Sequence, residues 1–229
     1  MPLTIHYLHN FQSDLITWLC EELDIPYELK PTNIKHCTLP APYRSFKILS
    51  LSLRTIWREY YICQKHGNGR LFLPPSHHDC ADFVYYFHWA NGTFQPFLGR
   101  LMMLNAGSGG GGDGTRGRDP DANPNPNPRV ALWNDRLTRS LENLDKRFKP
   151  KSEGGDGATW LAGDEFTAAN IMVVFSLTTF RNWFAYSLRG YDGILGYLAG
   201  VGGRDGYKRA MAKADPDMRL LLGAEVSSS

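Results

Sequence analysis

The sequence predicts an α/β unit followed by an all-α bundle, and three observations lead to this prediction. A strand–helix–strand pattern occupies residues 3–30. Residues 79–105 form one long pattern with helical spacing. A polar helix start at residues 160–171 leads into an apolar run that ends at Phe180.

The first pattern consists of a strand, a helix and a second strand. Residues 3–8 are mainly β-favouring, and residues 27–30 resume that character. The dipeptide Ile25-Pro26 ends the helix between them. Apolar residues recur in that helix with helical period: Leu15, Ile16, Leu19, Cys20 and Leu23. The α/β unit is therefore predicted over residues 1–74, where two prolines end it as a stiff linker.

An all-α unit is predicted over residues 79–229. The apolar spacing places helices at 79–105, 130–148 and 186–207, followed by a last short helix. Pro96 lies inside the first of these and should kink it, because proline has no N–H and its ring crowds the preceding turn. Gly, Pro, Asn and Asp dominate residues 107–128, so we expect a disordered surface insert there.

The helix start at residues 160–171 has the features of a capping box. Thr167 is the natural N-cap, and Asn170 can reach back to it from the third helical position. Phe166 and Ile171 can close a hydrophobic staple across the cap. The run from Ile171 to Phe180 is apolar almost all round, so this helix should be central and buried.

Composition limits the classes of function. The chain has 229 residues and a net charge of +2 with nearly balanced signs, which argues against a nucleic-acid reader driven by bulk charge. No apolar run has the length of a membrane span. We expect no secretory signal, and the four cysteines form no CxxC pair, so a cytoplasmic protein with free thiols is the default.

Two segments resemble one known family. The sequence WLAGDEFTAANI (residues 160–171) is similar to the capping-box helix of glutathione transferases, which usually have Asp where this chain has Asn170. The sequence WLCEELDIPYE (residues 18–28) is similar to their first helix and second strand. The resemblance implies a thioredoxin-like domain over 1–74 and the family's all-α domain over 79–229. It also implies glutathione as co-substrate, a small-molecule electrophile as partner, and a homodimer.

The resemblance breaks between residues 50 and 58. The family has two antiparallel strands here, a cis-proline that pairs with the cysteinyl unit of glutathione, and a Glu-Ser pair that binds its γ-glutamyl group. This stretch is too short for a hairpin with its turns and contains neither proline nor Glu-Ser. The thioredoxin-like domain is therefore expected to lack two strands. Either the glutathione site is eroded, or the coding sequence is wrongly spliced here. Tight binding of glutathione would contradict an eroded site and would mean that Arg54, Arg58 or a partner subunit replaces the lost groups.

The resemblance also indicates where the thiolate of glutathione would be stabilised. The family uses a hydrogen-bond donor at the start of its first helix, where Asn10, Gln12 and Ser13 are the donors of this chain. Phe11 occupies the place of one family serine and cannot donate. Ser13 can equally be a plain N-cap. Tyr7 is the next candidate donor, although a strand tyrosine is more often a core residue.

The remaining candidate residues are assigned by position. Lys35 and His36 follow the second strand and are candidates for binding the glycine carboxylate of glutathione, or are ordinary loop residues. The expected pocket for the electrophile involves His88, Asn91, Arg100 and Met103 of the long helix, and Arg181 after the buried helix. Packing in the core or at an interface explains the four residues of the long helix equally well, and Arg181 can equally lie at a helix end on the surface. No metal site is expected, since the adjacent histidines of residues 77–80 cannot easily share one metal face.

These features predict a glutathione transferase that presents glutathione thiolate to an electrophilic aromatic or polyketide-like small molecule, for transfer or isomerisation. The altered site suggests a tailoring role in secondary metabolism. The rival prediction is a catalytically inactive protein of this fold that serves as a binding or interaction module. The missing Glu-Ser pair favours the rival.

Overall fold

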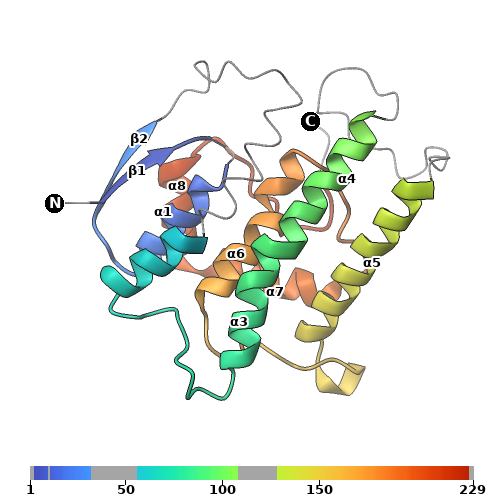
Figure 1. Cartoon of the computed structure of the whole chain (residues 1–229), viewed down its shortest axis with the longest axis horizontal. Coiled ribbons are helices and arrows are strands. Elements are labelled where there is room, and N and C mark those ends of the chain that lie inside the picture. The colour runs from blue at the N-terminus through green and yellow to red at the C-terminus, as the bar shows by residue number, and fades with distance from the viewer. Residues whose placement is uncertain (1–2, 10, 32–55, 108–127, 227–229) are drawn as a thin grey trace.

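The computed structural model describes residues 3–9, 11–31, 56–107 and 128–226 (Figure 1). The expected insert at 107–128, apart from its two end residues, lies outside the described residues. So does most of the stretch from residue 50 to 58, where two strands are expected to be missing. No described helix combines the length and the apolar character needed to cross a bilayer.

The N-terminal unit contains the predicted strand–helix–strand. Strand β1 (Leu3–Tyr7) pairs in parallel with β2 (Tyr27–Pro31), and helix α1 (Ser13–Glu22) connects them. In β1, Ile5 and Tyr7 point into the core, and their neighbours face outward. The described sheet has these two strands, so within the described residues β1 has a strand neighbour on one side only (Figure 1).

A helix over residues 56–65 and a series of turns lead to the long helix of the second unit. This helix consists of α3 (Cys80–Trp89), a π-helical turn η2 (Ala90–Phe94) and α4 (Gln95–Gly107). The N–H of Gln95 bonds to the carbonyl of Ala90, five residues back. This wider turn ends two residues before Pro96, the residue at which the sequence predicts a kink, and Pro96 itself lies in the first turn of α4.

The remaining helices form a bundle around α6 (Figure 1). They are α5 (Pro128–Phe148), the short η3 (Lys151–Glu153), α6 (Ala168–Leu177), η4 (Thr179–Asn182), α7 (Asp192–Gly203) and α8 (Asp205–Ala214). Every residue of α6 is buried, which confirms the expectation from its apolar run. Helix α6 packs against α3 and α1, so one hydrophobic core extends through both units.

Helix α1 is also fixed to α8 by ion pairs. Glu22 accepts hydrogen bonds from Arg204 (2.7 and 2.9 Å). Glu21 accepts from Arg209 (2.8 Å) and Lys213 (2.5 Å). Both carboxylates are largely buried, so the position of α1 relative to the helical unit is well determined.

Thr167 is the N-cap of α6, as predicted, with φ −129° and ψ 170°. Its hydroxyl, however, accepts a hydrogen bond from the side-chain amide of Asn170 (3.3 Å) and makes no capping bond to a backbone N–H. The carbonyl oxygen of the Asn170 side chain accepts from the N–H of Leu161 (3.1 Å) and the hydroxyl of Tyr197 (3.2 Å). Asn170 therefore connects the cap to two other segments.

We expect Thr167→Ala to lower the free energy of unfolding by about 1 kcal/mol, because it removes the buried hydroxyl that accepts a hydrogen bond from Asn170. Asn170→Ala should cost more, about 2 kcal/mol or above, because it leaves the buried N–H of Leu161 without an acceptor and removes the shorter of two hydrogen bonds of the Tyr197 hydroxyl. Chemical denaturation measures both. Thr159→Ala, at an exposed site just before the same turn, is the matched control. An unchanged midpoint for both buried variants would contradict this account of the cap.

Candidate functional site

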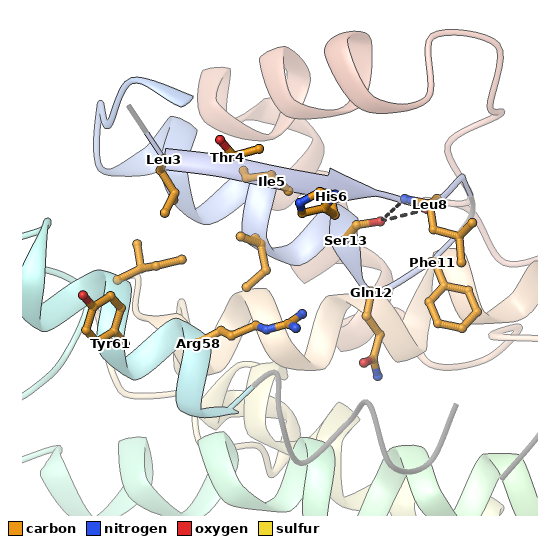
Figure 2. Close-up of a pocket in the computed structure, with 12 residues that line it drawn as sticks. Leu3, Thr4, Ile5, His6, Leu8, Phe11, Gln12, Ser13, Arg58 and Tyr61 are labelled. Carbon is orange, nitrogen blue, oxygen red and sulfur yellow. Dashed lines mark hydrogen bonds between the residues drawn. The ribbon is translucent and has the colours of Figure 1, made fainter. Parts of the chain in front are cut away.

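A cleft of about 350 Å³ lies beside β1 (Figure 2). Its walls are β1 itself, residues 11–16 at the start of α1, and the helix over residues 56–65, which contributes Arg58, Tyr61 and Ile62. Apolar side chains form most of the lining. The start of α1 is where the sequence predicts the thiolate donors, so this cleft is the candidate site.

Ser13 lines the cleft, but its hydroxyl is already used. Ser13 is the first residue of α1, and its Oγ donates to the carbonyl of Leu8 (2.8 Å) and accepts from the N–H of Leu8 (3.1 Å), as Figure 2 shows. The N-cap position belongs to Gln12, whose side chain makes no capping bond. The serine therefore closes the turn between β1 and α1. This role differs from the two that the sequence suggests, a donor to the thiolate and an N-cap.

The other donors of the loop have different surroundings. Gln12 lines the cleft although only 4% of it is exposed. Phe11 lines the cleft as well and packs edge-on against Trp183, with ring centroids 6.1 Å apart. Asn10 lies outside the described residues, and so do Lys35 and His36. Of the three predicted donors, the structure therefore places Gln12 and Ser13 in the cleft.

Tyr7 is a core residue, and its hydroxyl lies between two buried carboxyl groups. The oxygen is 3.1 Å from Oδ1 of Asp14 and in very short contact with Oδ2 of Asp215. Burial, followed by the charge of Asp14, raises the pKa of Tyr7 far above its usual value. The phenol therefore keeps its proton and donates it within the core, which leaves none for a thiolate.

Arg58 is the cation that the structure places in this cleft. It lies in the first turns of the described helix over 56–65, and its guanidinium extends along the cleft toward the side of α1 (Figure 2). The residue is exposed, and no described residue forms a hydrogen bond or ion pair with it. A guanidinium beside an apolar wall can bind a carboxylate in a bidentate manner.

The five residues predicted for the electrophile pocket do not meet in this cleft. His88 is exposed on α3, Asn91 is buried in η2 with its amide 3.4 Å from the sulfur of Met172, and Met103 is half-buried on α4. Arg100 lies over the ring of Trp133 in α5, 6.0 Å from its centroid. The π-helical turn adds one residue to the helix, which rotates α4 by about 100° relative to the predicted face.

Arg181, the fifth of these residues, is a structural residue. It is fully buried, and its guanidinium donates to the backbone carbonyls of Leu177, Tyr186, Gly223 and Ala224 at 2.6–3.4 Å. These bonds attach the segment after α8 to the end of α6. In the core, carbonyls from several chain segments lie close together, and one guanidinium has enough N–H groups to donate to all of them.

The groups that sequence reasoning missed are Asp14, Asp215 and His9. Asp14 lies in the first turn of α1, where the helix dipole favours a negative charge at the surface, yet only 2% of the residue is exposed. Asp215 and Tyr7 are 208 residues apart in the sequence and in contact in the fold. No local pattern indicates that acidic residues this far apart will be buried together, so the sequence held no signal for this cluster.

His77, His78 and Asp79 lie close together, with one potential ligand atom each within 4.8 Å of the others. Nδ1 of His77 accepts the N–H of Asp79 (3.1 Å), so the neutral ring carries its proton on Nε2, which contacts Glu165 at 3.2 Å. Both nitrogens of His77 are thereby occupied, which is unfavourable for metal coordination.

Comparison with known proteins supports the fold. No family model and no curated protein sequence matches the chain. Among solved structures, a glutathione S-transferase from Actinobacillus pleuropneumoniae aligns with a TM-score of 0.59 at 20% identity, covering 96% of this chain and 98% of that one. A delta-class glutathione transferase from Nilaparvata lugens aligns with a TM-score of 0.63 at 16% identity, covering 91% and 92%.

A glutathione transferase from Methylococcus capsulatus aligns over 92% of this chain and 98% of its own, at 14% identity and a TM-score of 0.62. All three alignments span both units, so they agree with the strand–helix–strand of the first unit and the helical bundle around α6 of the second. The chain therefore has the glutathione S-transferase fold, with a thioredoxin-like N-terminal unit and an all-α C-terminal unit.

Proposed function

We propose that the chain is a glutathione transferase-like enzyme that holds glutathione in the cleft beside β1 and activates its thiol. The thiolate would be transferred to an electrophilic aromatic or polyketide-like small molecule, or would isomerise it, as a tailoring step of secondary metabolism in the cytoplasm. Structural neighbours were crystallised with oxidised glutathione, lactoylglutathione and 1-(S-glutathionyl)-2,4-dinitrobenzene, which supports glutathione as the co-substrate.

The observation that carries this proposal is Arg58 in the cleft. Glutathione has two carboxylates, and the cleft otherwise offers mainly apolar surface. A guanidinium that is not paired with any described residue is the group expected to bind one of them. Gln12 and Ser13 lie across the cleft at the start of α1, so a ligand held by Arg58 would extend toward the predicted thiol position (Figure 2).

Arg58→Gln should weaken glutathione binding by about 10- to 150-fold, because a charge-assisted hydrogen bond contributes about 1.5–3 kcal/mol. Isothermal titration of the two proteins measures the change. Lys65→Gln is the matched control, since it removes one exposed positive charge from the same helix outside the cleft. Equal affinities of wild type and Arg58→Gln would exclude Arg58 as the carboxylate ligand.

The second candidate function is a non-enzymatic binding protein of this fold. The hydroxyls of Ser13 and Tyr7 are both committed to internal hydrogen bonds, which favours it. Conjugation of glutathione to 1-chloro-2,4-dinitrobenzene discriminates between the two functions. Binding of glutathione without conjugation would favour the non-enzymatic protein.

A homodimer is part of the proposal. Large side chains are exposed on the helix over 56–65 (Trp57, Tyr60 and Tyr61) and on α3 (Val84 and Tyr85). Phe72 joins these two elements, with ring centroids 5.6 Å from Tyr60 and 4.9 Å from Phe83. An exposed apolar surface of this kind is typical of an interface between protein chains.

A further inference from the structure

Strand β1 has one paired edge and one open edge. On one side it pairs in parallel with β2, from Leu3 opposite Tyr27 to Tyr7 opposite Pro31. On the other side, no described residue forms a backbone hydrogen bond with Leu3–Tyr7, and the described sheet ends there. Alternate residues of a strand point their N–H and C=O groups to opposite sides, so β1 presents main-chain donors and acceptors along this open edge.

The cleft of the candidate site lies along this open edge. Side chains of a strand alternate between its two faces, so a cavity over one face contacts every second residue. This cleft is lined by four consecutive residues, Leu3, Thr4, Ile5 and His6, and none of its described lining residues belongs to β2. It therefore runs in the plane of the sheet, on the side of β1 where a third strand would lie (Figure 2).

The far wall limits the cleft to a single strand. The helix over residues 56–65 contributes Arg58, Tyr61 and Ile62 and lies across the cleft from β1 (Figure 2). One strand residue fills about 160 Å³, from a rise of about 3.3 Å, a strand spacing of about 4.8 Å and a sheet thickness of about 10 Å. A cleft of about 350 Å³ thus encloses about two residues of extended chain. A short peptide fits this space, and the sheet of another protein does not.

The lining favours an acidic peptide. Its ionisable groups are the imidazole of His6, the guanidinium of Arg58 and the phenol of Tyr61, and none of the described lining residues is acidic. His6 and Arg58 are both exposed. Glutathione has two carboxylates and one ammonium group, so it is a net anion near neutral pH and its charge complements this lining.

We propose that glutathione binds in this cleft as a third strand, with the main chain of its cysteinyl residue paired to the open edge of β1. This inference rests on the proposed function, which takes glutathione as the ligand of the cleft. The N–H and C=O of one residue in an extended chain point to the same side. The cysteinyl N–H therefore donates to a carbonyl of β1, and the cysteinyl C=O accepts an N–H of β1.

Two kinds of contact then hold the ligand. A carboxylate of glutathione lies against Arg58, and its main chain lies along β1. The pairing to β1 supplies a backbone contact in a chain whose residues 50–58 contain no proline that could provide one. It also fixes the ligand in an extended conformation, in the cleft that Gln12 and Ser13 line from the start of α1.

Methylation of single amides of the ligand separates strand pairing from other modes of binding. The probe is γ-Glu-Ala-Gly, which keeps the main chain and both carboxylates of glutathione but has no thiol. A methyl group on the alanine nitrogen removes the donor that faces β1, so the affinity should fall about 10-fold or more. The matched control is γ-Glu-Ala-sarcosine. It carries the same methyl on the next amide, which faces away from β1, so its affinity should stay close to that of the probe. NMR titration of the full chain measures all three.

Hydrogen exchange locates the pairing on the protein. The probe γ-Glu-Ala-Gly, at about ten times its dissociation constant, should slow the exchange of one edge-facing amide of β1 by about 10-fold. The amides next to it in the strand donate toward β2 and should change less. Residue-resolved exchange by NMR on the full chain measures these rates with and without the probe.

Equal affinities of the probe and its N-methylalanine analogue, or the same loss in both methylated peptides, would overturn the strand pairing. Protection of every β1 amide in the free chain would do so too, because another segment would then cover the edge. If glutathione is bound and conjugated despite such a result, this inference alone fails. If the probe pairs with β1 but glutathione is never conjugated to 1-chloro-2,4-dinitrobenzene, the enzymatic function fails and the binding mode holds. If neither peptide binds, both fail.

Discussion

Titration of the purified chain with glutathione is expected to give a dissociation constant about two to four decades weaker than a site that binds the whole γ-glutamyl group. The sequence lacks the Glu-Ser pair and the proline of the family's site, and losing two charge-assisted contacts costs about 3–6 kcal/mol. Arg58 is the cation that the described cleft offers in their place. Isothermal titration calorimetry measures the affinity directly.

The control is a protein with the two expected strands restored between residues 50 and 58. If it binds tightly and conjugates glutathione while the chain as it stands does not, the coding sequence is wrongly spliced and the transferase function holds. If both fail, the non-enzymatic function gains. Tight, stoichiometric binding by the chain itself would refute the eroded site and assign the lost contacts to Arg58 or to a partner subunit.

The second large effect is expected from Asp14→Asn, which should stabilise the protein at pH 8 by about 4 kcal/mol relative to wild type. Burial raises the pKa of Asp14 from 3.8 to about 7 in the folded state. The folded state therefore holds this proton more tightly than the unfolded state. The contribution of this proton to the free energy of unfolding is fully present below pH 3.8 and is lost as the pH rises to about 7. Asparagine reproduces the protonated acid and has no charge to bury.

Urea denaturation of both proteins between pH 4 and pH 8 tests this prediction. The difference in unfolding free energy between Asp14→Asn and wild type should grow as the pH rises from 4 to about 7 and then level off. Asp135→Asn, at a half-exposed site of α5, should show no such trend. A difference that stays constant from pH 4 to pH 8 would show that Asp14 is ionised in the fold throughout.

The sequence by itself determined the features that depend on neighbouring residues. The spacing of apolar residues predicted α1 and α6, and α6 is buried on all sides as expected. Thr167 is the cap of α6, and the chain changes its helical geometry just before Pro96. Propensity, capping and proline geometry act within a few residues, so a single sequence contains all the information they need.

Only the tertiary structure decided which polar groups are available to a ligand. Ser13 and Tyr7 look like donors in the sequence, but one closes a turn on Leu8 and the other donates to a carboxylate from the far end of the chain. Arg181 is buried against backbone carbonyls, and His9 contacts Asp215 from the other end of the chain. Hydrogen-bond partners and burial depend on contacts between segments up to 208 residues apart, which no local pattern encodes.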